Sequence, residues 1–317
     1  MKAYYMINYG GPEVMQYGDV REPSGREGEA IVEVKAVSLN PLDWKIRDGQ
    51  TRFITGRKFP KILGADFAGK IKEINKISTG LTIGDNVYGS IRLYLKNQGA
   101  LAERVVVPIG ALHKIPEGCS FEEAAALPIA GLTALNGLRL CGILENKKIV
   151  VNGATGGVGH FVVQMAMAAG ASITAVASTK NLEIAKTLGA GKVIDYMEQD
   201  ITRQSEKYDI FFDAYGMVKF SNARKILNKK GIFATTLGMP GVVLTKFWNS
   251  FTGQQKIVLA NYRGKPEDYR ALGKMIEQGV VKPLVGKIFP FQETHRAFEE
   301  SEKGGVAGKI VVSLQEI

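Results

Sequence analysis

The chain has 317 residues, of which 45% are hydrophobic and 23% are charged, a composition typical of a globular protein. This length exceeds what one hydrophobic core usually organises, so we expect two domains. The formal net charge is +10, but the lysines are spread along the chain and form no arm that would bind nucleic acid. We therefore expect no nucleic-acid partner and at most a weak peripheral association with acidic membranes.

Cysteine content and the N-terminus bear on the cellular compartment. The two cysteines, Cys119 and Cys141, are isolated and form neither a disulfide framework nor a metal cluster. The N-terminal residues lack the apolar core of a signal peptide, and we expect a cytoplasmic protein. Residues 149–179 carry no Asp, Glu, Lys or Arg and are long enough to span a bilayer. Their five glycines favour a buried strand–helix–strand unit instead.

The first third of the chain is rich in β-strand patterns. Residues 30–37 and 67–74 alternate between apolar and polar side chains, as half-buried strands do. A turn at 84–89 leads into a strand, and another strand ends at 102–108. Short strands separated by glycine and proline predict a small, partly closed β-barrel.

The pattern changes at Ser120, which forms a capping-box match with Glu123 at the start of a helix. Strands and helices then alternate, which predicts a doubly wound parallel sheet. The expected strands are 148–152, 173–177, 193–194, 209–213, 231–236 and 256–260. The expected helices are 158–169, 181–188 and 220–227. A helix near 267–278 and a final strand at 308–312 are expected to return to the first domain.

The strongest motif lies between the strand at 148–152 and the helix at 158–169. Ala154, Gly156 and Gly159 occupy the three glycine positions of the dinucleotide fingerprint, with alanine at the first. Gly156 would let the backbone approach a pyrophosphate at the helix N-terminus, and Gly159 would let the helix pack close to the sheet. The expected cofactor-binding residues of this loop are Ala154, Thr155, Gly156, Gly157, Val158 and Gly159. The alternative is a glycine-rich turn without a ligand, which the alternating strands disfavour.

The end of the second expected strand indicates which nicotinamide cofactor is bound. NAD sites usually carry an acid there, but this strand is followed by Ser178 and Lys180, which suit the 2′-phosphate of NADPH. Tyr196, after the third strand, can add a hydroxyl, and Tyr215, after the fourth, lies where a nicotinamide-side loop belongs. In the alternative interpretation Ser178 caps the next helix, Lys180 is solvated and Tyr215 belongs to a domain interface.

These features and five further segments resemble the medium-chain dehydrogenase/reductase superfamily over essentially the whole chain. The segments are Asn40–Lys45, Leu63–Gly69, Gly84–Gly89, Ala124–Ala134 and Gly308–Val311. The resemblance implies an α/β fold with a GroES-like β-barrel domain and a doubly wound parallel-sheet Rossmann domain. The implied boundaries are 1–122 with 261–317 for the barrel domain and 123–260 for the Rossmann domain, with the active site between them.

Zinc-containing members of this superfamily differ from the chain at their ligand positions. They carry a cysteine in place of Asn40 and Gly-His-Glu in place of Gly64–Asp66, and this chain has only three histidines. The chain resembles the zinc-free quinone oxidoreductase branch, so we expect no metal. That branch commonly forms homodimers through the edge of the Rossmann sheet, where the apolar segment 256–260 is the candidate edge.

The resemblance implies an NADPH-dependent reductase of quinones or α,β-unsaturated carbonyls. Thr133 and Asn40 would lie near the nicotinamide ring. Asn40, or Lys45 if it faces inward, would donate a hydrogen bond to the substrate anion that forms after hydride transfer. A non-catalytic NADPH-binding protein and a trans-acting enoyl reductase remain as alternatives.

Four other polar residues are expected in structural roles. Asp43 is interpreted as a hydrogen-bond acceptor that holds a turn rather than as a general base. His113 is expected in a surface turn and His295 on an amphipathic helix. His160 is expected in helix packing, with a place near the phosphate as the alternative. No combination of nucleophile and base typical of a hydrolase is present.

Overall fold

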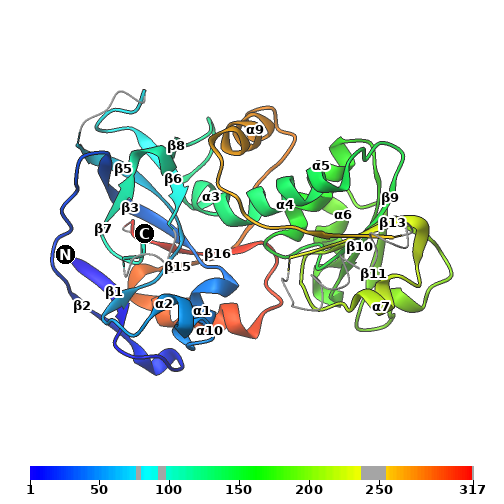
Figure 1. The fold of residues 1–317 in the computed structure, drawn as a ribbon, viewed down its shortest axis with the longest axis horizontal. Helices are drawn as coiled ribbons and strands as arrows, with labels where there is room; N and C mark the ends of the chain where they lie inside the picture. The colour runs from blue at the N-terminus through cyan, green and yellow to red at the C-terminus, as the bar shows by residue number, and fades with distance from the viewer. Residues whose placement is uncertain (76–79, 92–97, 237–254, 316–317) are drawn as a thin grey trace. The chain divides into compact units, whose positions relative to one another are not determined.

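The computed structural model describes residues 1–75, 80–91, 98–236 and 255–315. They form two compact units. Figure 1 shows the fold, with colours that run from blue at the N-terminus to red at the C-terminus. Unit 1 comprises Met1–Ile129, Gly264–Glu277 and Val285–Ile317, and unit 2 comprises Ala130–Arg263 and Gln278–Leu284. The first boundary therefore follows Ile129 rather than residue 122, and a short piece of the C-terminal region belongs with unit 2.

Unit 1 is built mainly on antiparallel sheets. The larger sheet has the order β15-β16-β3-β5-β6-β8, and β7 also pairs with β3. These strands are β3 (Glu29–Ser38), β5 (Asp66–Ile74), β6 (Asn86–Ser90), β7 (Arg104–Pro108), β8 (Leu112–Lys114), β15 (Val285–Pro290) and β16 (Lys309–Ser313). A second sheet has the order β2-β1-β4, with β1 (Lys2–Met6), β2 (Met15–Asp19) and β4 (Lys61–Ile62). The helices of this unit are α1 (Pro41–Arg47), α2 (Arg52–Thr55), α3 (Phe121–Ala125), α9 (Pro266–Glu277) and α10 (Thr294–Lys303).

Unit 2 is a six-stranded parallel sheet with the order β11-β10-β9-β12-β13-β14. The strands are β9 (Lys148–Asn152), β10 (Ser172–Ala177), β11 (Lys192–Asp195), β12 (Tyr208–Asp213), β13 (Leu227–Thr235) and β14 (Lys256–Leu259). Within the described residues its helices are α4 (Pro128–Cys141), which begins just before the boundary, α5 (Gly159–Ala168), α6 (Leu182–Thr187) and α7 (Phe220–Ala223). Counted from β9, this is the 3-2-1-4-5-6 order of the Rossmann fold, with α5 and α7 on opposite faces (Figure 1). The predicted fold class is confirmed.

The uncharged stretch at 149–179 forms β9, the glycine loop, α5 and β10, as predicted. Residues 159–166 of α5 are all buried, which explains why this helix carries no charged side chain. None of the helices in the described ranges has the length and apolar character needed to cross a bilayer.

Two predictions about local structure are wrong. The helix expected at 220–227 ends at Ala223, because the strand pairing of Leu227 with Tyr208 draws the following residues into β13. His113 is not a surface-turn residue: its ring stacks on that of Tyr269 with centroids 3.7 Å apart. Burial and the nearby Arg270 lower the pKa of His113 to about 4.

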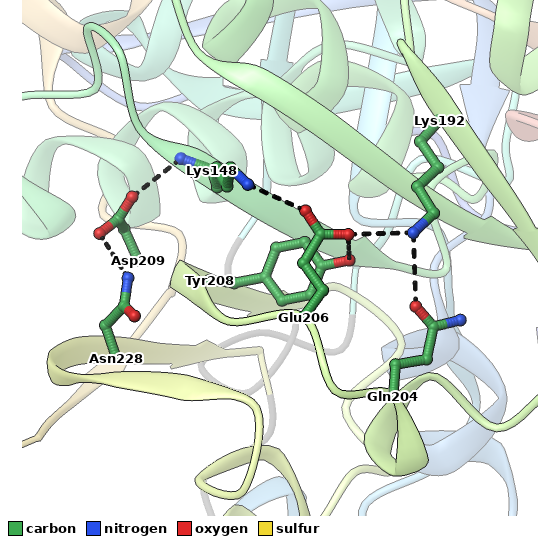
Figure 2. A network of polar contacts seen from close by, with 7 residues as sticks. All are labelled: Lys148, Lys192, Gln204, Glu206, Tyr208, Asp209 and Asn228. Atoms are coloured by element: carbon green, nitrogen blue, oxygen red, sulfur yellow. Dashed lines mark hydrogen bonds and ion pairs between the residues drawn. The ribbon is translucent and has the colours of Figure 1, made fainter.

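Polar contacts join the amino ends of several strands in unit 2 (Figure 2). The Glu206 carboxylate lies 3.1 Å from the Lys148 ammonium and 3.0 Å from that of Lys192, and it accepts a hydrogen bond from the Tyr208 hydroxyl. Asp209 accepts from the backbone N–H of Lys148 at 2.9 Å, again across strands. Glu206 thus lies between the first residues of β9 and β11.

The Glu206 contacts generate a pH-dependent prediction. Hydrogen bonds from Lys192 and Lys148 lower the pKa of Glu206 to about 2, below its unfolded value of 4.5. The stabilisation of the fold by the ionised Glu206 carboxylate is therefore present above pH 4.5 and is lost as the pH falls towards 2. Because the carboxylate is one-third exposed, we expect Glu206→Gln to cost at most about 1 kcal/mol at neutral pH.

Thermal unfolding of the wild type and of Glu206→Gln, followed from pH 7 down to pH 3, measures this effect. The difference in melting temperature between wild type and Glu206→Gln should shrink as the pH falls. A difference that grows towards acid pH would contradict the assignment.

The edges of the parallel sheet are β11 and β14. Among the strands of the described ranges, the segment 256–260, which includes β14, therefore lies at one edge of the sheet, and a sheet edge is able to pair with a second chain. The homodimer expected through this edge stays a prediction.

Candidate functional site

The glycine loop joins β9 to α5 at the carboxyl end of the parallel sheet. The backbone N–H of Ala154 donates to the Val176 carbonyl at 3.0 Å, which ties the loop to β10. Gly153 has a φ of 72°, a value that favours glycine. A Cβ atom at Gly159 would lie 2.0 Å from the Gly153 carbonyl oxygen, whereas one at Gly156 would meet only that oxygen, at 3.3 Å. The loop thus has one glycine, Gly159, with no room for a Cβ atom, and a more open one, Gly156, where a Cβ atom would be close to a single backbone oxygen.

The other predicted cofactor residues follow neighbouring strands of the same sheet. Ser178 and Lys180 follow β10, Tyr196 follows β11 and Tyr215 follows β12. Because these strands are parallel neighbours, their carboxyl ends lie along one edge of the sheet. The structure therefore brings these residues to the same edge as the glycine loop.

Ser178 supports a ligand at this edge. Its Oγ atom is buried and finds no hydrogen-bond partner in the described part of the chain. Although Ser178 precedes the short 3-10 helix Thr179–Asn181, its side chain does not cap that helix, so the alternative interpretation as a cap is wrong. An unpaired buried hydroxyl costs about 1–3 kcal/mol, which a bound polar group can recover.

Lys180 is exposed two residues after Ser178 and has no ion-pair partner within the described ranges. A hydroxyl and an ammonium in this position have the chemistry that binds a phosphate. The residues present therefore fit a nicotinamide dinucleotide, and they fit a phosphate on its adenosine ribose.

Asp213 organises the loop that carries Tyr215. One carboxylate oxygen accepts from the Asn152 side-chain amide at 2.8 Å and from the Gly216 backbone at 3.0 Å. The other accepts from the Val218 backbone at 2.8 Å. Burial raises the pKa of Asp213, and these hydrogen bonds oppose that rise. The sequence locates this loop but gives no reason to assign Asp213 a positioning role.

His160 packs the first turn of α5, as predicted. Its Nδ1 atom lies 2.9 Å from the Gly156 carbonyl, and Nε2 accepts from the Leu284 backbone N–H at 3.1 Å. These partners place the proton on Nδ1. Gln164, one turn later, exchanges two hydrogen bonds with the backbone of Lys282. These contacts explain why this short segment from the C-terminal region belongs with unit 2.

Thr133 lies in α4 and is buried. The helix packs closely in unit 2, since a Cβ atom at Gly137 would lie 2.7 Å from the Ala260 side chain and 2.8 Å from that of Phe212. The predicted position of Thr133 beside a nicotinamide ring stays a prediction.

In unit 1, Asp43 holds the start of α1 as a hydrogen-bond acceptor. Its carboxylate accepts from the backbone N–H of Asn40 at 2.7 Å and from that of Gly64 at 3.1 Å. Asp43 is fully buried, and burial, reinforced by the negative charge of Asp66, raises its pKa to about 7. This geometry agrees with the interpretation of Asp43 as an acceptor that holds a turn.

A buried lysine is the centre of the polar cluster beside Asp43. The Lys309 ammonium donates to Asn40 Oδ1 at 2.6 Å and to the Leu39 carbonyl at 2.9 Å. Asn40 Nδ2 in turn donates to Asp66 Oδ2 at 2.9 Å and to the Ser38 carbonyl at 3.4 Å. Burial lowers the pKa of Lys309 and raises that of Asp66, while their mutual attraction opposes both shifts. Both Asn40 amide hydrogens therefore have partners inside the protein.

The same cluster decides whether zinc fits at these positions. Asn40 already uses its amide oxygen to hold an ammonium, Ala65 has no donor atom, and a buried cation would repel a metal ion. Within the described ranges, no group of three or more His, Cys, Asp or Glu side chains is arranged to hold a metal. The residues at the ligand positions of the zinc-containing relatives do not fit zinc.

Lys45 and Trp44, both in α1, carry side-chain donors that are not used in hydrogen bonds within the described ranges. Lys45 is half-buried, and its Nζ atom lies 5.4 Å from the centroid of the Trp44 ring. Trp44 Nε1 is buried without a hydrogen-bond partner in the described part of the chain. The sequence assigns Trp44 no role, because only the folded structure reveals that its N–H has no partner among the described residues.

Comparisons with known proteins agree with this geometry. Two family models match, the alcohol dehydrogenase GroES-like domain over residues 26–117 and the zinc-binding dehydrogenase over residues 188–312. The chloroplast envelope quinone oxidoreductase homolog of Arabidopsis thaliana is 32% identical, over 98% of both chains. The NADPH-dependent alkenal/one oxidoreductase of A. thaliana is 33% identical, over 98% of this chain and 79% of its own. A solved quinone oxidoreductase from Coxiella burnetii superposes with a TM-score of 0.88, at 28% identity over 99% of both chains.

The Rossmann sheet, the glycine loop and the barrel sheet define a nicotinamide-dependent oxidoreductase with two domains. The chain belongs to the medium-chain dehydrogenase/reductase superfamily, and its relatives include quinone oxidoreductases. The family predicted from the sequence is confirmed. The zinc-binding dehydrogenase model matches only residues 188–312 and so does not extend to the positions around Asn40 and Ala65.

The two loop glycines generate a matched pair of variants. Gly156→Ala places a methyl group where a pyrophosphate would approach, so we expect cofactor affinity to fall at least about tenfold with little change in stability. Gly159→Ala forces a methyl group against the Gly153 carbonyl, so we expect a loss of about 1–3 kcal/mol in unfolding free energy.

Cofactor titration and thermal melting of both variants test this distinction. If Gly156→Ala binds NADPH as tightly as wild type, the loop does not hold the pyrophosphate.

Proposed function

We propose that the protein is a zinc-independent, NADPH-dependent oxidoreductase that reduces quinones or α,β-unsaturated carbonyls. The observation that carries this proposal is the Lys309–Asn40–Asp66 cluster, whose chemistry does not fit the metal of the alcohol dehydrogenases. The names of the relatives support the substrate class, since they include quinone oxidoreductases and an alkenal/one oxidoreductase.

Unit 2 supplies the cofactor-binding residues in this proposal. The open glycine Gly156 and the N-terminus of α5 receive the pyrophosphate. Ser178 and Lys180, assisted by Tyr196, hold the 2′-phosphate, and Tyr215 lies on the nicotinamide side. When bound, NADPH supplies the hydride for the reduction.

Unit 1 supplies the groups that stabilise the anion formed on the substrate oxygen. The Lys45 ammonium and the Trp44 N–H are the available donors, and Asn40 is able to contribute only by releasing its long bond to the Ser38 carbonyl. A positioned donor of this kind contributes about 3–4 kcal/mol to the transition state. The final proton can come from water, so the reaction needs no dedicated general acid.

Oxidation of NADPH with a panel of quinones, enones and enoyl thioesters tests the function as a whole. Turnover with quinones or enones supports the proposal. Turnover confined to enoyl thioesters indicates an enoyl reductase, and cofactor binding without turnover of any acceptor indicates a non-catalytic protein.

The cofactor preference generates a prediction at Lys180. A charge-assisted contact with the 2′-phosphate is worth about 1.5–3 kcal/mol, so NADPH should bind about tenfold to a hundredfold more tightly than NADH. Lys180→Glu should remove or reverse this preference, while Lys186→Glu, on a solvent-facing turn of α6, should leave it unchanged. Equal affinities of the wild type for the two cofactors would overturn the assignment.

The donors of α1 generate a second prediction. Lys45→Ala and Asn40→Ala should each slow turnover by about tenfold to a thousandfold when the chemical step limits the rate. Asn40→Ala should also lower stability, because it leaves the Lys309 ammonium without one of its two acceptors. Trp44→Phe should slow turnover without lowering stability, because it removes an N–H that is unpaired in the folded protein.

Steady-state kinetics and melting temperatures of these variants separate the two effects, and Lys70→Ala, at an exposed position of β5, is the control. Unchanged turnover in both Lys45→Ala and Asn40→Ala would show that neither residue stabilises the anion.

A further inference from the structure

Unit 1 contains a cavity of about 920 Å³ that shares no residue with the candidate cofactor or catalytic sites. Its walls come from the connection between β2 and β3, from β7, and from the segment between α2 and β4. Four cationic side chains line it: Arg21, Arg26, Lys58 and Arg104. Its apolar lining includes Phe59, Ile62 and Val106. The cavity thus combines positive charge with an apolar surface.

The two carboxylates of the cavity are already occupied. Glu22 pairs with Arg104 at 2.8 Å and with the amino group of Met1 at 3.6 Å. Glu29 accepts a hydrogen bond from the backbone N–H of Arg26 at 3.0 Å. The backbone N–H does not neutralise Glu29, but four cationic side chains against these two carboxylates still leave an excess of positive charge.

Three of the cations remain without partners. The side chains of Arg21, Arg26 and Lys58 are exposed, and none has an ion pair or a side-chain hydrogen bond within the described ranges. Three unpaired cations in one concave surface favour an anionic ligand.

The short helix α2 adds an exposed apolar tip to the same segment of chain. Phe53 is 90% exposed and Ile54 is 68% exposed, immediately before residues that line the cavity. The Arg52 guanidinium lies over the Phe53 ring, 5.2 Å from its centroid. Adjacent exposed apolar side chains with cations beside them are typical of proteins that bind a membrane surface.

We propose that this face of unit 1 binds the surface of an anionic phospholipid bilayer. Arg21, Arg26 and Lys58 receive the lipid phosphates, while Phe53 and Ile54 enter the interfacial layer beside them. A nucleic acid would use the cations but not the apolar tip, so the combination favours a lipid surface. This inference is independent of the proposed reductase chemistry.

Vesicle co-sedimentation of the full chain tests the proposal. We expect binding to vesicles made of equal parts phosphatidylcholine and phosphatidylglycerol, little binding to phosphatidylcholine alone, and weaker binding as salt increases.

Two double variants test the two parts of the surface. Arg26→Glu with Lys58→Glu should weaken vesicle binding by about tenfold or more, since each cation near an anionic surface contributes about fivefold. Phe53→Ser with Ile54→Ser should weaken it comparably without any change in charge. Melting temperature and NADPH affinity should stay at wild-type values in both.

The matched control is the double variant Lys229→Glu with Lys230→Glu. It replaces two exposed lysines of β13 and changes the net charge by the same amount. It should bind vesicles within about twofold of wild type. An equal loss of vesicle binding in the control and in the Arg26/Lys58 variant would overturn the proposal, because net charge alone would then explain binding. Binding of inorganic phosphate through Arg26 and Lys58, with no binding of anionic vesicles, would also overturn it.

Discussion

The hydrogen bonds of the Lys309 ammonium are the interactions on which the buried polar cluster of unit 1 depends. Lys309 lies in β16, near the C-terminus, yet it bonds to Leu39 and Asn40 at the end of β3. Asn40 then holds Asp66 at the start of β5, and Asp66 accepts from the Ile129 backbone N–H at 3.1 Å. A buried charge that loses its partners costs about 3–5 kcal/mol, so these distant segments must assemble together.

In the proposed function, this cluster explains how the superfamily scaffold serves without zinc. The barrel keeps the backbone that places residues 40 and 64–66 side by side, but a fixed lysine and its acceptors occupy that region. The proposed chemistry relies on positioning and on hydrogen-bond donors rather than on a Lewis acid. Trp44 and Lys45, on the helix that follows Asn40, are the donors that this arrangement leaves available.

Much of the fold could be predicted because its signals are local. The apolar strands of unit 2, the capping box at Ser120 and the glycine loop each depend on residues close together in sequence. The place of Ser178 directly after a strand likewise predicts its contact with the cofactor from sequence alone.

The features that sequence reasoning missed depend on partners far away along the chain. Lys309 and Asn40 are 269 positions apart, so no local pattern identifies them as a pair. His113 was expected at the surface because its neighbours look like a turn, but Tyr269 covers its ring. The attachment of Leu284 to His160 likewise requires the folded chain. Tertiary contacts, rather than local propensity, determine these environments.

Metal analysis of the untagged protein tests the central claim most directly. If Lys309 and its acceptors replace the metal of the zinc-containing relatives, protein purified with zinc in the medium should contain far less than one zinc per chain. Its turnover with NADPH and a quinone should also be unaffected by a chelator. One zinc per chain that disappears in Asn40→Ala or Asp66→Asn, together with loss of turnover in chelator, would contradict the account.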